Sequence, residues 1–422
     1  MRTLGAIGRI AEHWWLIAIV AVGLGLRVVT VSVLDLEQPE SDYLGYQAMA
    51  LNLIAGRGIV DPTGNLAMLN MGYATFVLAP TFALFRGSLL AAQLANALLG
   101  AISVALVWAV AREAGAGRVG RIVAAASWAL YLPSWVYAEY LAKENLLIPL
   151  VLATLWCVLR LSRVIVAGTA ILCGVLFGLI ALAGNAGLSL GLAFAAAVVG
   201  APGSVGRKLR AGLITLAAAG CIVAPWLIRN QHEIGAAVLN TNGGFNLYLG
   251  NNPAATGLFI SIADTPRGPT WQALRREQGE ARASDTLRAE ALQWIRQHPR
   301  QFVLLSLKKA VLFWTPPVHE GQGPQSTVET LVRAVWLVQY ALLVAATIAG
   351  LLMPSLRRRE VALLWLAVLA YTAVHMLFYV SYRYREPVMP VLCVLAALTI
   401  ETLLARLPLL KPSGIAVADT RR

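Results

Sequence analysis

Long apolar runs alternate with short polar turns along most of the chain. Taking about 20 residues as the length of one membrane-spanning helix, such runs occur at 14–33, 88–111, 122–138, 145–160, 164–182, 187–201, 211–228, 331–353, 361–380 and 388–405. The pattern predicts an all-α, polytopic integral membrane helix bundle with about ten transmembrane helices. No small-residue cleavage site follows the first run, so we expect it to remain as the first helix.

Composition supports this class, because 58% hydrophobic and 13% charged residues in a chain of 422 do not suit a soluble domain. The net charge of +13 is expected to lie in cytoplasmic turns and beside lipid headgroups, with no nucleic-acid partner. The cysteines lack paired spacing and lie in apolar runs, which predicts buried packing residues and no disulfide framework: Cys157, Cys173, Cys221 and Cys393.

The segment from Met71 to Phe85 is apolar but short, and it contains Pro80. If it does not cross the membrane, the basic turns all fall on the side of the N-terminus, as the positive-inside rule requires. These turns contain Arg112, Arg118, Arg121, Arg160, Arg163, Arg207, Lys208, Arg210, Arg357, Arg358 and Arg359. We therefore expect a re-entrant or surface helix here, and both termini in the cytoplasm.

This topology divides the chain into three parts. Residues 1–228 form an N-terminal transmembrane module whose first outer loop is 34–87, residues 229–330 form an extracytoplasmic loop with amphipathic helices, and residues 331–422 form the last transmembrane helices and a cytoplasmic tail. The pattern also predicts short outer turns near 139–144 and 381–387. The unusual polar residues are thereby expected on the outer face.

An acidic-aromatic stretch, Pro39-Glu40-Ser41-Asp42-Tyr43, follows the first apolar run. Carboxylates beside a bilayer are costly unless they have a function. Apolar residues at helical spacing then predict a juxtamembrane amphipathic helix from Asp42 to Ala55, stopped by Gly56. Asp42 would begin this helix, where a plain capping role is the alternative to a catalytic one.

The second outer loop contains three predicted elements. The Asn- and Gly-rich segment 240–253 predicts tight turns. Residues 285–301 predict an amphipathic helix that closes at His298-Pro299, and 302–314 would continue along the membrane interface.

Four strings in this chain resemble the GT-C fold glycosyltransferases, specifically family 39, the polyprenyl-phosphate-sugar-dependent enzymes related to protein mannosyltransferases and aminoarabinose transferases. They are SDYLGYQAMALNLIAGRGI in the first outer loop, QLANALLGAISVALVWAVAREAGAGRVGRIVAAASWALYLP in the second and third spans, RNQHEIGAAVLNTNGGFNLYLGNNPAATG in the central outer loop, and RYREPVMP from Arg383 to Pro390. Each string is weak alone, but their order and common side of the membrane support one another. Many members of the family have a Pro-Gly-Tyr-Pro element after the first loop. At the corresponding place this chain has Asn70-Met71-Gly72-Tyr73-Ala74, without either of the two prolines.

The resemblance implies an inverting glycosyltransferase that moves a hexosyl or pentosyl group from a polyprenyl-phosphate donor to a lipid, glycan or protein acceptor. It further implies a compact enzyme of the bacterial inner membrane, with its active site facing the periplasm and without the large soluble domain of oligosaccharyltransferases. No cofactor is expected. A divalent ion held by Asp42 and Glu144 stays an alternative, although the histidines show no ligand spacing and no metal site is predicted.

The implied chemistry needs a carboxylate to take the acceptor's proton and a cation to hold the departing phosphate. Asp42 matches the family's first-loop acid and is assigned as the general base, with Tyr43 beside it on the substrate. Glu144 is the second catalytic acid, with Glu139 as runner-up. A structural ion pair between Glu144 and Lys143, or a headgroup contact, is the alternative.

For the phosphate we favour Arg383 and Arg385, because a guanidinium matches phosphate oxygens and the positive-inside rule disfavours arginine in an outer turn. Tyr384 between them is expected to contact substrate. An arginine extending to the interface is the alternative explanation. Weaker cationic candidates are Arg57, Lys143, Lys308 and Lys309. The donor is expected between Asp42 and the late arginines, across one outer cavity.

Two other functions stay open. A polymerase or ligase that uses lipid pyrophosphate-linked glycans would have the same type of fold. A lipid or solute transporter would also be a basic helix bundle, but it should carry buried ionisable groups in its spans, and the sequence offers only Asn185 and His375 as faint candidates. A scaffold protein would leave the outer acids and arginines without a purpose.

Overall fold

A computed structural model describes residues 2–34, 38, 42–316 and 326–407, with backbone only for residues 2–11. These residues form helices, and within them only an isolated bridge between Leu258 and Val380 has extended pairing. The proposed catalytic stretch is therefore described from Asp42 onward, and Pro39, Glu40, Ser41 and the tail from 408 lie outside the described residues. The all-α membrane fold predicted from the sequence is confirmed.

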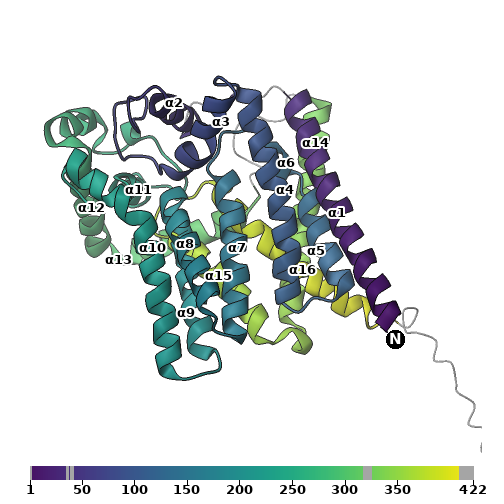
Figure 1. Ribbon diagram of the computed structural model, residues 1–422. Coiled ribbons are helices and arrows are strands. Elements are labelled where there is room, and N and C mark those ends of the chain that lie inside the picture. Colours follow the sequence, from purple (N-terminus) through teal and green to yellow (C-terminus); the bar gives the residue numbers. More distant parts are fainter. Residues whose placement is uncertain (1, 35–37, 39–41, 317–325, 408–422) are drawn as a thin grey trace, which may run out of the picture.

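The helices form a bundle and an outer layer (Figure 1). The bundle contains α1 (Arg2–Val33), α4 (Leu89–Glu113), α5 (Arg118–Leu130), α6 (Pro133–Val136), α7 (Glu144–Arg163), α8 (Ala167–Ala183), η2 (Asn185–Leu190), α9 (Gly191–Gly200), α10 (Val205–Ile234), α14 (Thr327–Leu351), η5 (Pro354–Leu356), α15 (Arg359–His375), η6 (Tyr382–Val388) and α16 (Met389–Leu404). The outer layer contains α2 (Asp42–Ile54), η1 (Ala74–Leu78), α3 (Ala79–Leu84), α11 (Asn242–Gly250), η3 (Ile262–Asp264), η4 (Gly268–Thr270), α12 (Trp271–Gln297) and α13 (Pro299–Trp314).

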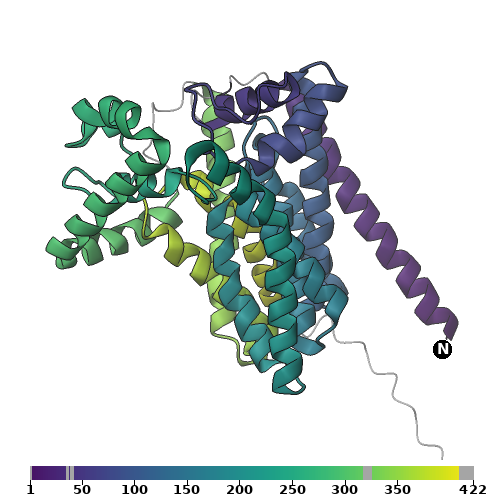
Figure 2. The same ribbon diagram turned by 60° about the vertical axis from the view of Figure 1, so that its left-hand side comes forward.

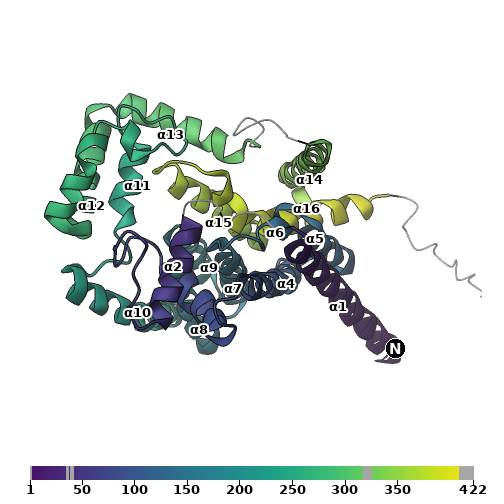
Figure 3. The same ribbon diagram turned by 90° about the horizontal axis from the view of Figure 1, so that it is seen from above.

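Views from the side and from the outer end show how the two layers differ. Helices of the outer layer gather at one end of the bundle in Figure 2. In Figure 3, seen from that end, α14 is viewed along its axis while α13 lies across the view. α2 therefore lies across the bundle's end, while α12 and α13 project beside the bundle, as expected for helices at a membrane surface.

Six helices in the described residues are long and apolar enough to cross a membrane, and the expected count of ten is not confirmed. The candidate spans are Glu12–Val33 in α1, Leu89–Glu113, Glu144–Arg163, Val205–Ile234, Thr327–Leu351, and Tyr382–Leu404, which joins η6 and α16. The other expected spans correspond to the shorter α5, α8, α9 and α15. The run 122–138 is not one helix, because α5 ends at Leu130 and Pro133, which has no amide hydrogen, starts the short α6.

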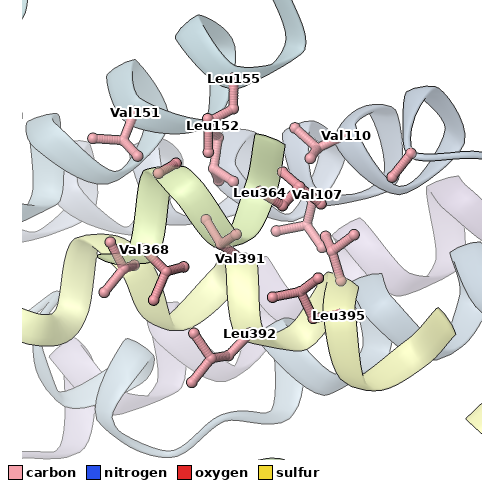
Figure 4. Packing of buried hydrophobic residues seen from close by; sticks show 14 of the residues in the cluster. Val107, Val110, Val151, Leu152, Leu155, Leu364, Val368, Val391, Leu392 and Leu395 are labelled. Carbon is pink, nitrogen blue, oxygen red and sulfur yellow. The ribbon is translucent and has the colours of Figure 1, made fainter. Parts of the chain in front are cut away.

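The core of the bundle is formed by α4, α7, α15 and α16. Figure 4 shows their branched aliphatic side chains interdigitating, with Val107, Leu152, Leu364 and Val391 at the centre. All four residues are fully buried. α7 and α16 are both buried over most of their length, so these two are the innermost helices of the bundle.

The basic turns meet at the end opposite the outer layer. Arg121 forms an ion pair with Glu12 of α1, and Arg163 pairs with Glu113 at 3.2 Å, so the start of α1 and the ends of α4 and α7 share one side. Arg359 extends the same cluster by donating to the carbonyl of Ser162 at 2.7 Å. This agrees with the expected topology, in which these turns are cytoplasmic. The segment η1–α3 packs on α2 in the outer layer and is too short to span.

Two predictions in the outer layer are wrong. The Asn- and Gly-rich segment 240–253 contains the helix α11, in which Gly244 and Gly250 lie against neighbouring backbone and do not form tight turns. The amphipathic helix predicted from 285 begins at Trp271 and passes through a kink at Gly279, where φ is 75°. Its predicted end before His298-Pro299 is confirmed.

Two predictions within the spans are also wrong. The sequence indicated no buried charge there, yet Arg27 of α1 is fully buried and donates to Ser134 Oγ at 2.8 Å. The sequence feature that indicates this buried charge is Arg27 itself, a charged residue inside an apolar run. Cys221 is exposed on the bundle surface, whereas the other three cysteines are buried as expected.

Gly244 of α11 provides a test of this packing. A Cβ atom there would lie 1.9 Å from the backbone oxygen of Ser284 in α12, whereas a Cβ atom at Gly243 would meet no atom within 4 Å. We expect Gly244→Ala to destabilise the protein by about 1–3 kcal/mol, the usual cost of overpacking, and Gly243→Ala to serve as the matched control. Thermal unfolding of the detergent-solubilised protein measures both, and equal midpoints for the two variants would contradict the close approach.

Candidate functional site

A charged cluster lies where the outer layer meets the bundle. Arg383 forms an ion pair with Asp42, and its Nε atom lies 3.9 Å from Glu144 Oε1. The Glu144 side chain is 3% exposed and that of Asp42 is 31% exposed, so the cluster runs from the buried interior to an accessible edge. The positive charge of Arg383 therefore compensates the negative charges of two carboxylates, those of Asp42 and Glu144.

Three segments far apart in the sequence supply these side chains. Asp42 is the first residue of α2, Glu144 the first of α7, and Arg383 lies in η6. Carboxylates at helix N-termini are stabilised by the positive end of the helix dipole. Pro387 and Pro390 keep η6 from joining α16 as one regular helix, and Arg383 in η6 has a side chain that is only 16% exposed.

Aromatic rings enclose the guanidinium. The Arg383 Cζ atom lies 5.2 Å from the ring centre of Tyr43 and 5.5 Å from that of Tyr384, within the range of cation–π attraction. Tyr43 also stacks on Tyr140 with ring centres 5.5 Å apart. Burial raises the pKa of the Tyr43 hydroxyl, and the Arg383 charge partly opposes that shift, so Tyr43 stays a neutral hydrogen-bonding group.

A cavity of about 380 Å³ adjoins the cluster. Its wall contains Glu144, Lys143, Tyr384, His375, Tyr379 and an amide-rich group, Asn70, Asn185, Asn240, Asn242 and Asn246. The cavity has the size and the few convergent polar groups of a small-molecule site.

Several buried acceptor atoms in this wall lack a hydrogen-bond partner among the described residues. They are Glu144 Oε2, Asn185 Oδ1, Asn242 Oδ1 and Asn246 Oδ1. Buried polar atoms are normally paired, so such a group favours a ligand that brings hydrogen-bond donors.

The predicted substrate residues fall into two groups. Lys143 and Tyr384 line the cavity, and Tyr43 packs on Arg383. Glu139, the runner-up acid, does not line the cavity and is fully buried, and it accepts from Gln93 Nε2 at 2.5 Å. Its position therefore favours a packing role.

Arg385 does not join the predicted phosphate site. It is buried and donates to the carbonyls of Phe313 at 3.1 Å and Thr315 at 2.9 Å, with its guanidinium 4.7 Å from the ring centre of Tyr340. The two arginines alternate in a tight 3-10 helix and point to different surroundings.

The cavity does not lie between Asp42 and Arg383, the place that the sequence predicts for it. These two side chains are in direct contact, and the cavity lies beside Glu144 instead.

None of the weaker cationic candidates except Lys143 lines the cavity. Arg57 donates to Asn52 Oδ1 at 2.9 Å in the first outer loop, and Lys308 is exposed. Lys309 is fully buried in α13, 3.2 Å from Asn251 Oδ1.

The sequence does not predict a sugar-binding role for the amide cluster, and it offers Asn185 only as a faint transporter candidate. Asn240, Asn242 and Asn246 were interpreted only as turn residues, and Asn70 only as a departure from the family pattern. A usable signal was the helical spacing of Asn242 and Asn246, which places two amides on one helix face.

The chemistry of the cluster does not suit a divalent ion in this arrangement. A cation shared by Asp42 and Glu144 would have to displace the guanidinium that contacts both. No group of three or more His, Cys, Asp or Glu residues in the described part of the chain could hold a metal.

No protein-family profile matches the chain, and no curated protein matches it. Solved structures do match. The oligosaccharyltransferase AglB from Archaeoglobus fulgidus, in complex with an inhibitory peptide and a dolichol-phosphate, aligns with a TM-score of 0.55 and 13% identity over 94% of this chain and 51% of that one. The same organism's oligosaccharyltransferase in the apo form gives 0.56 and 14% over the same shares. This chain has the GT-C fold.

The fold that the sequence resemblance implies is thus confirmed. ArnT from Cupriavidus metallidurans, bound to undecaprenyl phosphate, aligns less well, with a TM-score of 0.44 and 16% identity over 92% of this chain and 78% of that one. This GT-C chain spans about half the length of the archaeal oligosaccharyltransferases it matches.

The buried Lys309 predicts a specific pH dependence. Burial lowers the pKa of its amine from 10.5 to about 8. The unfolded chain therefore binds the proton more tightly, and the resulting penalty is full below pH 8 and is relieved as the pH rises towards 10.5. We expect the melting temperature of the native protein to rise relative to that of Lys309→Met across this window. The exposed neighbour provides the control, Lys308→Met, and a constant difference from pH 7 to 10.5 for both variants would contradict the burial effect.

Proposed function

We propose that this protein is an inverting glycosyltransferase. It would transfer a hexosyl or pentosyl group from a polyprenyl-phosphate donor to an acceptor at the extracytoplasmic face of a bacterial inner membrane. The observation that carries the proposal is the Asp42–Arg383–Glu144 cluster beside a cavity whose wall is rich in hydrogen-bond acceptors. The archaeal oligosaccharyltransferase that shares the fold binds a dolichol-phosphate, which supports a lipid-phosphate donor.

Asp42 would be the general base. As the acceptor oxygen bonds to the anomeric carbon, the bond from that carbon to the phosphate oxygen breaks on the opposite face, and the acceptor's proton passes to the Asp42 carboxylate. Attack opposite the leaving group inverts the anomeric configuration. Asp42 is partly exposed, which suits a base that an acceptor must reach.

Arg383 would hold the lipid phosphate. Negative charge grows on the phosphate oxygens as the glycosidic bond breaks, and a guanidinium binds such oxygens through two parallel hydrogen bonds. Asp42 forms an ion pair with that guanidinium. Binding of the donor phosphate would compete for Arg383, loosen the ion pair and free the Asp42 carboxylate to accept a proton.

Glu144 and the amide cluster would hold the sugar. Hydroxyl groups supply the donors that Glu144 Oε2, Asn185 Oδ1 and Asn246 Oδ1 lack among the described residues. Tyr384 and Lys143 line the same space and would contact the sugar or its phosphate. Placing the sugar inside and the phosphate at the edge leaves the isoprenoid chain directed to the surrounding lipid.

Substitution of the base tests the assignment. We expect Asp42→Asn to lower transfer by about 10²–10⁴-fold, the usual contribution of a general base, while the donor binds at least as tightly, because the shape is kept and the neutral amide no longer competes as an anion for Arg383. Transfer is measured as release of polyprenyl phosphate by purified protein reconstituted with membrane extract as the source of acceptor. The exposed Asp264 gives the control Asp264→Asn. Normal turnover in Asp42→Asn would reject the base assignment.

Substitution of the guanidinium tests the donor site. We expect Arg383→Gln to raise the Kd for polyprenyl phosphate by about 10–100-fold, because hydrogen bonds to charged groups contribute about 1.5–3 kcal/mol. Equilibrium binding to the solubilised protein measures the effect, and Arg57→Gln, in the outer loop but away from the cavity, is the control. An unchanged Kd in Arg383→Gln would exclude the phosphate role. Parallel turnover assays with pyrophosphate-linked glycans separate the proposed transferase from a ligase or polymerase.

A further inference from the structure

A second large hollow lies at the end of the bundle opposite the candidate active site. It has a volume of about 830 Å³ and is bounded by the end of α14, by η5 and by the first half of α15. Its lining includes Leu351, Arg357, Arg358, Val361, Trp365 and Leu369. We call it the inner groove. In Figure 1 the α14–α15 turn lies at the end of the bundle away from α2 and α3.

Hydrogen bonds fix the inner groove beside the other basic turns. Arg358 reaches the carbonyl of Gly115, after α4, at 3.5 Å. Arg359 donates to the carbonyls of Ser162 in α7 at 2.7 Å and Ala197 in α9 at 2.5 Å. The groove is therefore at the cytoplasmic boundary of the membrane, according to the positive-inside rule.

The apolar part of the inner groove faces the bilayer. Leu351 is 51% exposed and Leu369 is 59% exposed. Val361, Trp365 and Leu369 recur every four residues, so they form one stripe along α15. Because the hydrocarbon region contains no water, an open apolar groove at this depth is filled by lipid chains.

Arginine side chains at the inner groove have hydrogen-bond donors from which no protein group among the described residues accepts. Arg357 is exposed, and its side chain pairs with no carboxylate or carbonyl among the described residues. The Nε atom of Arg358 is buried without a partner in the same part of the chain. The adjacent Glu360 does not line the groove, and its carboxylate lies 3.3 Å from Arg163. Three arginines therefore border the groove without a carboxylate in its lining.

We propose that the inner groove is a binding site for one anionic phospholipid of the cytoplasmic leaflet. Its phosphate lies between Arg357 and Arg358, and an acyl chain follows the stripe Val361–Trp365–Leu369. Guanidiniums match phosphate oxygens, and basic pockets between transmembrane helices on the cytoplasmic side are suited to anionic headgroups. The site is independent of the proposed transfer reaction and lies at the other end of the bundle.

Lipid binding to the whole protein in detergent, followed by native mass spectrometry, tests the site. Phosphatidylglycerol and phosphatidylcholine with identical acyl chains are titrated in parallel. We expect phosphatidylglycerol to bind more tightly at one site, and Arg357→Gln to weaken that binding about fivefold, equivalent to about 1 kcal/mol for one basic residue near a headgroup. Ala362→Trp, which fills the groove from an exposed position, is expected to weaken binding by at least as much.

Matched variants distinguish the groove from general attraction to basic turns. Arg207→Gln changes an exposed cytoplasmic arginine outside the groove, and Ala18→Trp adds the same bulk to an exposed position on α1. Both should bind phosphatidylglycerol like the native protein. Equal binding of the two phospholipids, or native affinity in Ala362→Trp, would overturn the proposal. Displacement of phosphatidylglycerol by equimolar polyprenyl phosphate would also overturn it, because the occupant would then be the carrier lipid.

Discussion

The candidate site depends on one guanidinium that compensates two carboxylates at a membrane boundary. Arg383 contacts Asp42 and lies within 3.9 Å of Glu144, and these three side chains come from η6, α2 and α7. Removing any of them from water is costly, and leaving one unpaired there is costlier still. The cluster therefore holds the first outer loop, the start of α7 and η6 together.

The second outer loop in turn holds the first in place. Glu280 of α12 accepts hydrogen bonds from the amides of Leu66 and Ala67 at 3.0 and 3.1 Å, and the amide of Thr241 donates to the Ala67 carbonyl at 2.8 Å. Burial raises the pKa of Glu280, while these hydrogen bonds favour its charged form. The kink at Gly279, next to this carboxylate, lets α12 turn at the point where it contacts the first loop. The second outer loop is thus part of what positions Asp42.

The sequence predicted what depends on local pattern and missed what depends on long-range contacts. Hydrophobic runs located the bundle helices, and helical spacing located α2 from its first residue, Asp42. The divergence of Arg383 and Arg385 could not be predicted, because it depends on which partners surround a short 3-10 helix. The helix at 242–250 was missed for a similar reason, since Gly244 is required by the approach of Ser284.

The charges around the cavity also imply how the proposed lipid-linked sugar donor would be oriented in it. Glu144 and the amide oxygens of Asn185 and Asn246 line the space together with one amine, that of Lys143, so an anionic group placed inside would meet a carboxylate and several acceptors besides that amine. The guanidinium of Arg383 lies at the accessible edge, next to the partly exposed Asp42. A phosphate therefore gains most at the edge and a hydroxylated sugar gains most inside. The same distribution that makes the ion pair between Asp42 and Arg383 necessary would orient a lipid-linked sugar with its anomeric carbon close to the base.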